Sequence, residues 1–168
     1  PEKISLKGFI MPGEWEIQKS VWIVWPYNKK DWPGLFTKIP KVISEIISNL
    51  SIYQKVNLII NNHKDKIKVK KMLNQFKNNL SNIEFYSIPT NRIWIRDTGP
   101  IFLINDKTGD KIILNFKFNG WSKYKDYQKD NKINDKIIKL TKVRKIDPTI
   151  KVKNKIKKIV LEGGSIDV

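Results

Sequence analysis

The sequence predicts an α/β fold with mixed strand pairing, and three observations carry that prediction. Over residues 20–88, short apolar runs alternate with segments whose apolar residues recur at helical spacing, which is typical of strands joined by helical crossovers. Residues 99–118 instead hold two strand-like runs separated by a polar turn, which predicts an antiparallel hairpin. The 168 residues, 40% of them hydrophobic, suffice for one ordinary domain, and no linker rich in Pro, Gly or Ser divides residues 1–168.

The first half of the chain predicts three strands and two helices. Strands are expected over residues 20–25, 55–60 and 83–88, each of which is a short apolar run. From Ile39 to Leu50, apolar residues recur at i, i+3, i+4, i+7, i+8 and i+11, which predicts a helix with Pro40 in its first turn and with Ser44 and Ser48 on its polar side. The same spacing over residues 69–80 predicts the second helix.

The second half predicts a hairpin, a helix and a final strand. The hairpin strands are residues 99–104 and 111–118, joined by the polar turn 105–110. A helix is expected over residues 131–140 with Ile133, Ile137 and Leu140 facing inward. The last strand, residues 156–161, would deliver Glu162 at its end.

The formal net charge of +17 raises the question of nucleic-acid binding, because basic surfaces attract phosphate. The composition argues against it, since nearly all of the positive charge is lysine spread along the chain, and Arg92, Arg96 and Arg144 are the only arginines. Proteins that read phosphate and bases favour the arginine fork. We therefore expect no nucleic-acid partner. Two of three arginines within one motif indicate a role there that lysine would not fill.

Several other classes are excluded by simple features. No apolar run approaches the roughly 20 residues that cross a bilayer, and no signal-peptide pattern opens the sequence, so a cytoplasmic protein without a membrane partner is expected. The chain has no cysteine, which excludes disulfides and thiolate chemistry within these residues. Metal-ligand spacing and phosphate-binding loops are also lacking, so no metal and no other cofactor is expected. His63, the sole histidine, is predicted to lie in a solvated turn.

Two acidic turns stand out as candidates for chemistry. Residues 91–100, NRIWIRDTGP, bring the carboxylate of Asp97 together with an indole and two arginines, and residues 161–167, LEGGSID, carry Glu162. Both turns follow or precede strands, so one site could use both carboxylates, and their ligand would be a cation. Taken alone, Asp97 before Thr-Gly-Pro is more typical of a turn residue, and Glu162 before Gly-Gly is more typical of an ordinary charge at a strand end.

Six motifs occur in an order that resembles the agmatine deiminase family, which also holds bacterial peptidylarginine deiminases. The resemblance spans the chain from its first dozen residues to its last seven. The motifs are Met11–Glu16 (MPGEWE), Val21–Pro26 (VWIVWP), Asp31–Gly34 (DWPG), Trp94–Pro100 (WIRDTGP), Phe118–Trp121 (FNGW) and Glu162–Ser165 (EGGS).

The resemblance implies a pentein fold, an α/β propeller in which ββαβ modules form a fan around a central site, here incomplete. It implies a hydrolase that converts agmatine to N-carbamoylputrescine and ammonia, within putrescine biosynthesis. In that chemistry a cysteine attacks the guanidinium carbon, a histidine moves protons, and carboxylates hold the planar fork. Asp97 and Glu162 match the two carboxylates, and Trp94 matches an aromatic wall of the pocket.

Physical chemistry supports the carboxylate roles independently. A guanidinium is charged at any physiological pH and presents planar donors that carboxylates meet two at a time. A buried carboxylate opposite such a fork is compensated only when the cation is present. Asp97 and Glu162 are therefore expected to be poorly paired without substrate.

The other residues of these motifs have structural readings as well as functional ones. Trp121, in a glycine-flanked loop after a strand, could close over the site as a substrate-binding residue or serve packing alone. Arg96 is expected to fix the Asp97 loop, because a cation would repel a cationic ligand. Gly99, Gly163 and Gly164 are expected to shape the two loops.

The sequence departs from the family pattern in one respect. Family members continue to a His-x-Asp segment and a cysteine, and residues 1–168 contain neither. We therefore expect the chain to be the N-terminal portion of one catalytic domain and inactive alone, and we expect copies to associate through exposed strand edges. Two alternatives stay open, which are peptidylarginine deimination and a non-catalytic module that binds guanidino groups or polyamines.

Overall fold

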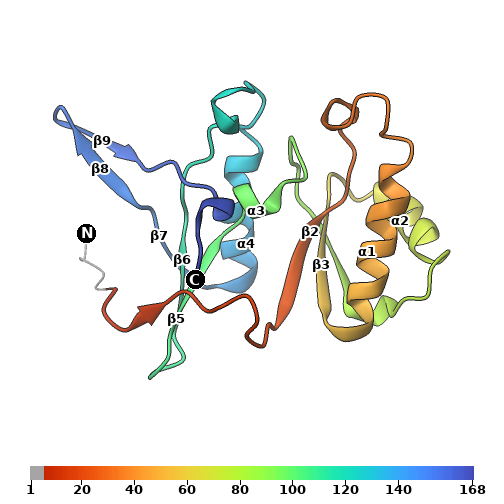
Figure 1. The fold of residues 1–168 in the computed structure, drawn as a ribbon, viewed down its shortest axis with the longest axis horizontal. Helices are drawn as coiled ribbons and strands as arrows, with labels where there is room; N and C mark the ends of the chain where they lie inside the picture. Colours follow the sequence, from red (N-terminus) through yellow and green to blue (C-terminus); the bar gives the residue numbers. More distant parts are fainter. Residues whose placement is uncertain (1–5) are drawn as a thin grey trace. The chain divides into compact units, whose positions relative to one another are not determined.

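The computed structural model describes residues 6–168, whose contacts divide the chain into two compact units. The parallel unit consists of Ile17–Ile95. The mixed unit combines the N-terminal segment up to Glu16 with Arg96–Val168. Figure 1 follows the chain through both units.

The parallel unit is a three-stranded parallel sheet covered by two helices. Its strands are β2 (Ser20–Val24), β3 (Lys55–Ile60) and β4 (Ile83–Ser87), paired in that order. The connections α1 (Ile39–Tyr53) and α2 (Asp65–Leu73) contact one another, as right-handed crossovers on one face of a sheet require (Figure 1). The three predicted strands are confirmed, and the central strand β3 is buried from its second residue onward.

The face that α1 buries differs from the predicted one. Ser44, Ser48 and Ser51 are at most 1% exposed, whereas Val42 and Ile46 are 49% and 45% exposed. The prediction that the serines lie on the polar side was therefore wrong. The hydroxyls of Ser44 and Ser51 donate to carbonyls of the helix itself, at Pro40 and Ser48 respectively and each at 2.7 Å, whereas the buried Ser48 hydroxyl has no hydrogen-bond partner among the described residues.

The second helix is shorter at its C-terminal end than the spacing predicts. It begins at Asp65 and ends at Leu73, and a separate 3-10 turn, η2, covers Leu80–Asn82. The Asn78 side chain explains the early end, because its amide donates to the carbonyls of Leu73 at 2.7 Å and Phe76 at 2.8 Å. The Asn78 side chain therefore satisfies carbonyls after the helix end, and the Leu73 carbonyl also accepts from the amide of Phe76 at 3.0 Å.

The mixed unit contains a four-stranded sheet of order β1-β5-β6-β7. The predicted hairpin is confirmed as β5 (Ile101–Asn105) and β6 (Lys111–Leu114), which pair antiparallel, and β1 (Phe9–Ile10) pairs antiparallel with β5. After β6 the chain passes through the 3-10 turns η3 (Gly120–Ser122) and η4 (Asp130–Lys132) and helix α4 (Ile133–Thr141) to β7 (Arg144–Ile146), parallel to β6. The sequence β5-β6-α4-β7 is a complete ββαβ module.

Two predicted details of this unit differ from the structure. Leu140 of α4 is 50% exposed, while Ile133 and Ile137 are fully buried as predicted. The expected last strand, residues 156–161, is confirmed only in part, because β9 (Lys155–Lys158) covers its beginning and Val160 forms an isolated bridge with Lys117. Strand β9 pairs with β8 (Thr149–Val152) in an exposed hairpin, in which Ile156 is 77% exposed. Its turn places Lys153 and Asn154 at positive φ, the geometry of a tight two-residue hairpin, and alternating Lys and Ile does not reveal which face meets a core.

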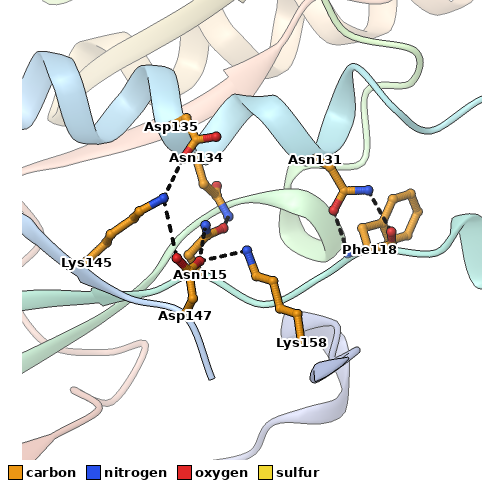
Figure 2. A network of polar contacts seen from close by, with 8 residues as sticks. All are labelled: Asn115, Phe118, Asn131, Asn134, Asp135, Lys145, Asp147 and Lys158. Atoms are coloured by element: carbon orange, nitrogen blue, oxygen red, sulfur yellow. Dashed lines mark hydrogen bonds and ion pairs between the residues drawn. The ribbon is translucent and has the colours of Figure 1, made fainter. Parts of the chain in front are cut away.

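A polar network joins α4 to the ends of β6 and β7 (Figure 2). The amide of Asn134 donates to Asn115 at 2.9 Å, and the amide of Asn115 donates to Asp147 at 2.7 Å. The Asp147 carboxylate also forms ion pairs with Lys158 at 2.8 Å and with Lys145 at 3.5 Å. Burial would raise the pKa of Asp147, but these donors and their charges outweigh it and lower that pKa.

Candidate functional site

Asp97 lies in the one-turn helix α3 (Ile95–Thr98), which leads into β5. Its carboxylate is partly buried within the mixed unit, and this burial raises its pKa above the ordinary value. The positive charge of Arg96 acts in the opposite direction but does not cancel the effect. Asp97 therefore carries a charge that its surroundings disfavour.

Glu162 follows an isolated β-bridge between the segment after β9 and the segment after β6. The chain after β9 pairs at Val160 with Lys117, and Glu162 then precedes the 3-10 turn η5 (Gly163–Ser165). The Glu162 carbonyl accepts from the amide of Ser165 at 3.0 Å and from its hydroxyl at 2.7 Å, which closes the turn. Burial and then the negative charge of Asp97 raise the pKa of Glu162.

The structure brings the Asp97 and Glu162 loops together within the mixed unit. A β-carbon on Gly163 would collide with the carbonyl oxygen of Arg96, and one on Gly164 would lie 3.6 Å from Oδ1 of Asp97. Across residues 6–168, neither the Asp97 nor the Glu162 carboxylate makes a hydrogen bond or an ion pair. Two neighbouring acids thus lie without an ion-pair partner among residues 6–168, in a chain of net charge +17.

Arg96 directs its guanidinium to Glu14, with which it forms an ion pair. Both side chains are about half exposed, at 54% and 60%. Glu14 stands in the MPGEWE motif, but the sequence alone assigned it no role. The available signal was an acidic residue in a motif that also contains a glycine turn, and a contact across more than 80 residues of chain could not be read from it.

The two tryptophans proposed to bind substrate fall in different units. Trp94 belongs to the parallel unit, where its ring lies 5.7 Å from that of Trp32, and it is 40% exposed. Trp121 belongs to the mixed unit and packs edge-on against Phe118, with ring centroids 4.8 Å apart. Its backbone has a φ of 55°, a left-handed conformation that is uncommon for a bulky residue.

The other arginine of the motif has a structural role inside the parallel unit. Arg92 is 4% exposed and forms an ion pair with Asp31, whose side chain is fully buried. Beside this pair, the Asn28 amide donates to the carbonyl of Asn91 at 3.0 Å. The segment before Trp94 is therefore fixed to the DWPG motif, a link that the sequence did not predict.

Other candidate sites are not supported by the part of the chain that is described. His63 is exposed in the turn between β3 and α2, as predicted. No group of three or more His, Asp or Glu side chains within residues 6–168 is arranged to hold a metal ion. None of the helices in that range is long and apolar enough to cross a membrane.

Gly99, one of the glycines expected to shape the two loops, lies between α3 and β5 and is half-buried.

Fold and carboxylate pair together define a mixed α/β protein of the pentein class with an acidic site. The chain belongs to the family of Porphyromonas-type peptidyl-arginine deiminases, whose model matches residues 10–168. A Streptococcus mutans protein that is provisionally named an agmatine deiminase is 31% identical over 166 residues, covering 96% of this chain and 42% of its own length.

Two solved structures of agmatine deiminases are also similar to this chain. The agmatine deiminase of Enterococcus faecalis matches with a TM-score of 0.77 and 27% identity, over 96% of this chain and 41% of that protein. A C. jejuni agmatine deiminase with substrate bound matches with a TM-score of 0.73 and 29% identity, over 99% of this chain and 45% of that protein. The chain thus spans less than half the length of the relatives it matches.

Proposed function

We propose that this chain is the guanidinium-binding, N-terminal portion of an agmatine deiminase-type hydrolase, and that both units belong to one catalytic domain. The observation that carries the proposal is the pair of neighbouring carboxylates, Asp97 and Glu162, that lack an ion pair with any residue from 6 to 168. Burial raises the pKa of both groups, and the negative charge of Asp97 raises the pKa of Glu162 further; a permanently charged planar cation would relieve these effects.

The proposed reaction converts agmatine and water to N-carbamoylputrescine and ammonia, a step of putrescine biosynthesis. The relatives named agmatine deiminases, including the C. jejuni protein with substrate bound, support agmatine as the ligand. In this reaction Asp97 and Glu162 hold the guanidinium fork in a fixed orientation while the charge on the attacked carbon is redistributed. The nucleophilic thiolate has no counterpart in a chain without cysteine.

The remaining motif residues have supporting roles in the proposal. Trp121, which belongs to the same unit as both carboxylates, supplies aromatic surface to the substrate, and Trp94 is assigned the same role by the family resemblance alone. Arg96, Gly99, Gly163 and Gly164 shape the two loops. The collision that any β-carbon at Gly163 would cause supports the role of that glycine.

A second candidate function is deimination of peptidyl-arginine, which the description of the matching family favours. Both substrates present the same guanidinium to Asp97 and Glu162, so the two functions differ in what the rest of the site accepts. A third candidate, a non-catalytic module that binds guanidino groups or polyamines, uses the same two carboxylates without any reaction.

Titration calorimetry with the purified chain tests ligand binding by Asp97 and Glu162, the step that all three candidate functions share. Agmatine is expected to bind, and Asp97→Asn or Glu162→Gln is expected to weaken binding by about tenfold or more, since each removes one charged partner of the fork. Asp106→Asn, in the exposed hairpin turn, is the matched control and should bind as the unmodified chain does. A blocked arginine amide that binds more tightly than agmatine would favour the peptidyl substrate, and spermidine binding equally well would favour a polyamine module.

Ammonia release separates binding from turnover. The purified chain is expected to release no ammonia from agmatine, because the reaction needs a thiolate that the sequence lacks. Release that disappears in Asp97→Asn would contradict this expectation. Equal affinity of the chain and of both carboxylate variants for agmatine would overturn the proposed site.

A further inference from the structure

The guanidinium of Arg96 pairs with Glu14 although Asp97 is its neighbour in sequence. The charge of Arg96 is felt at Asp97, where it lowers the pKa against the effect of burial, yet no ion pair or hydrogen bond joins the two side chains. An arginine that turned toward Asp97 would present the same fork as a guanidino ligand. It would therefore occupy the place that the proposed substrate needs.

Glu14 is presented to Arg96 by a tight turn of the N-terminal segment. The amide of Glu16 donates to the carbonyl of Gly13 at 3.1 Å, and the amide of Gly13 donates to Oε1 of Glu16 at 3.2 Å. Both bonds close the loop in which Glu14 lies. Its position is thus set by the turn, whereas the Arg96 side chain is long and has several rotamers available.

The backbone of Arg96 lies close to Gly163. Its carbonyl oxygen would collide with a β-carbon there, and its Cδ lies 3.4 Å from the position of that β-carbon. The Glu162 loop therefore limits where the Arg96 backbone can move, and the end of the side chain is placed by a different residue. Glu14 is the partner that places it.

We propose that Glu14 is a positioning residue that keeps the Arg96 guanidinium away from Asp97, so that the two carboxylates stay available for a cationic ligand. The inference rests on the proposed function, because it takes Asp97 and Glu162 as the ligand-binding pair. Loss of the Glu14 carboxylate would leave Arg96 next to two acids without counter-ions. The arginine would then act as an internal competitor of the ligand.

Carboxyl NMR of Asp97 tests this without any ligand. In Glu14→Gln, Arg96 is expected to approach Asp97 and to lower its pKa by about half a unit, because a nearby cation favours the charged form. Glu16→Gln is the matched control, since it removes one negative charge from the same turn while keeping an oxygen for the Gly13 amide. A pKa of Asp97 that is unchanged in Glu14→Gln, or that falls equally in Glu16→Gln, would overturn the inference.

Agmatine calorimetry on the same variants supplies the second readout. Glu14→Gln is expected to weaken agmatine binding by about two- to fivefold, the range that a half-exposed ion pair allows. Adding Arg96→Gln should remove the effect, so that Arg96→Gln binds alike with and without Glu14. A loss that persists in the double variant would show a merely structural role and overturn the inference. If the unmodified chain binds no agmatine, the proposed function fails, and the NMR result still decides the role of Glu14.

Discussion

The carbonyl oxygen of Arg96 lies so close to the position of a β-carbon on Gly163 that no side chain fits there without a shift of the backbone. The loops that carry Asp97 and Glu162 therefore meet backbone against backbone, and Gly164 continues this contact beside the Asp97 carboxylate. Side chains of ordinary size would separate the loops. The closeness of the two acids depends on residues that have no side chain.

Gly163→Ala is expected to destabilise the mixed unit by about 1–3 kcal/mol, because the added methyl group meets fixed backbone and the loop must shift. Urea unfolding measures the change. Gly164→Ala is the matched control, because its β-carbon would find only Oδ1 of Asp97 at an ordinary 3.6 Å, and it should stay within about 0.5 kcal/mol. Equal stability of both variants would contradict the crowding at Gly163.

Asp97→Asn is expected to stabilise the folded chain at pH 7. The pKa of Asp97 is raised in the folded state, chiefly by burial, so its contribution to stability is most favourable below the ordinary carboxyl pKa and is lost as pH rises through the raised value. The gain at pH 7 should be roughly 0.5 kcal/mol after allowance for solvent screening, and it should vanish below about pH 4. Unfolding curves at several pH values, with Asp106→Asn as the control, test the sign; destabilisation at pH 7 would contradict it.

Arg92→Lys is expected to lower the free energy of unfolding by about 3 kcal/mol. Lysine keeps the charge but not the planar fork, so the fully buried Asp31 loses part of its compensation. Lys55→Gln provides the comparison, since Lys55 and Glu84 form an ion pair that is about half exposed and should contribute less than about 1 kcal/mol. Chemical denaturation of both variants gives the result, and a smaller loss for Arg92→Lys than for Lys55→Gln would disprove the assignment.

Asp147→Asn is expected to destabilise the mixed unit at neutral pH by roughly 0.5–1 kcal/mol, discounted for the partial exposure of the side chain. The folded pKa of Asp147 is lowered, so its contribution is present above the ordinary carboxyl pKa and is lost as pH falls through the lowered value. The stability difference between the variant and the unmodified chain should therefore shrink as the solution is acidified. Denaturation at pH 7 and pH 3 measures it, and a constant difference would argue against the network in Figure 2.

The helices and strands could largely be predicted from the sequence, because the spacing of apolar residues and the length of an apolar run are local properties of the chain. Strand β3 was predicted with its observed bounds, and the antiparallel pairing of β5 with β6 followed from a polar turn between apolar runs. The face that each helix buries was harder to predict from the sequence. The serines that α1 buries carry no hydrophobic signal, so the spacing of apolar residues could not reveal which face of the helix is buried.

The candidate site was readable as residue types in motifs, but its geometry was not. The approach of Glu162 to Asp97 was expected from the two acidic turns and from the resemblance, but it depends on the close contact at Gly163, which leaves no pattern in the sequence. Glu14 was overlooked because an ion pair between distant segments leaves no periodic trace. The abundance of lysine did signal that Arg92 and Arg96 were special, without indicating their partners.

Arginine and lysine serve different ion pairs in this protein, and this difference has a practical consequence. The ion pairs at Asp31 and Glu14 use arginine, whereas Asp147 in Figure 2 is held by lysines. An amine-selective acylating reagent would therefore strip the positive charge from the surface and from the support of Asp147, while leaving both arginine pairs chemically intact. Such a reagent offers a way to reduce the large net charge of this protein while leaving Arg96, Glu14, Asp97 and Glu162 unmodified.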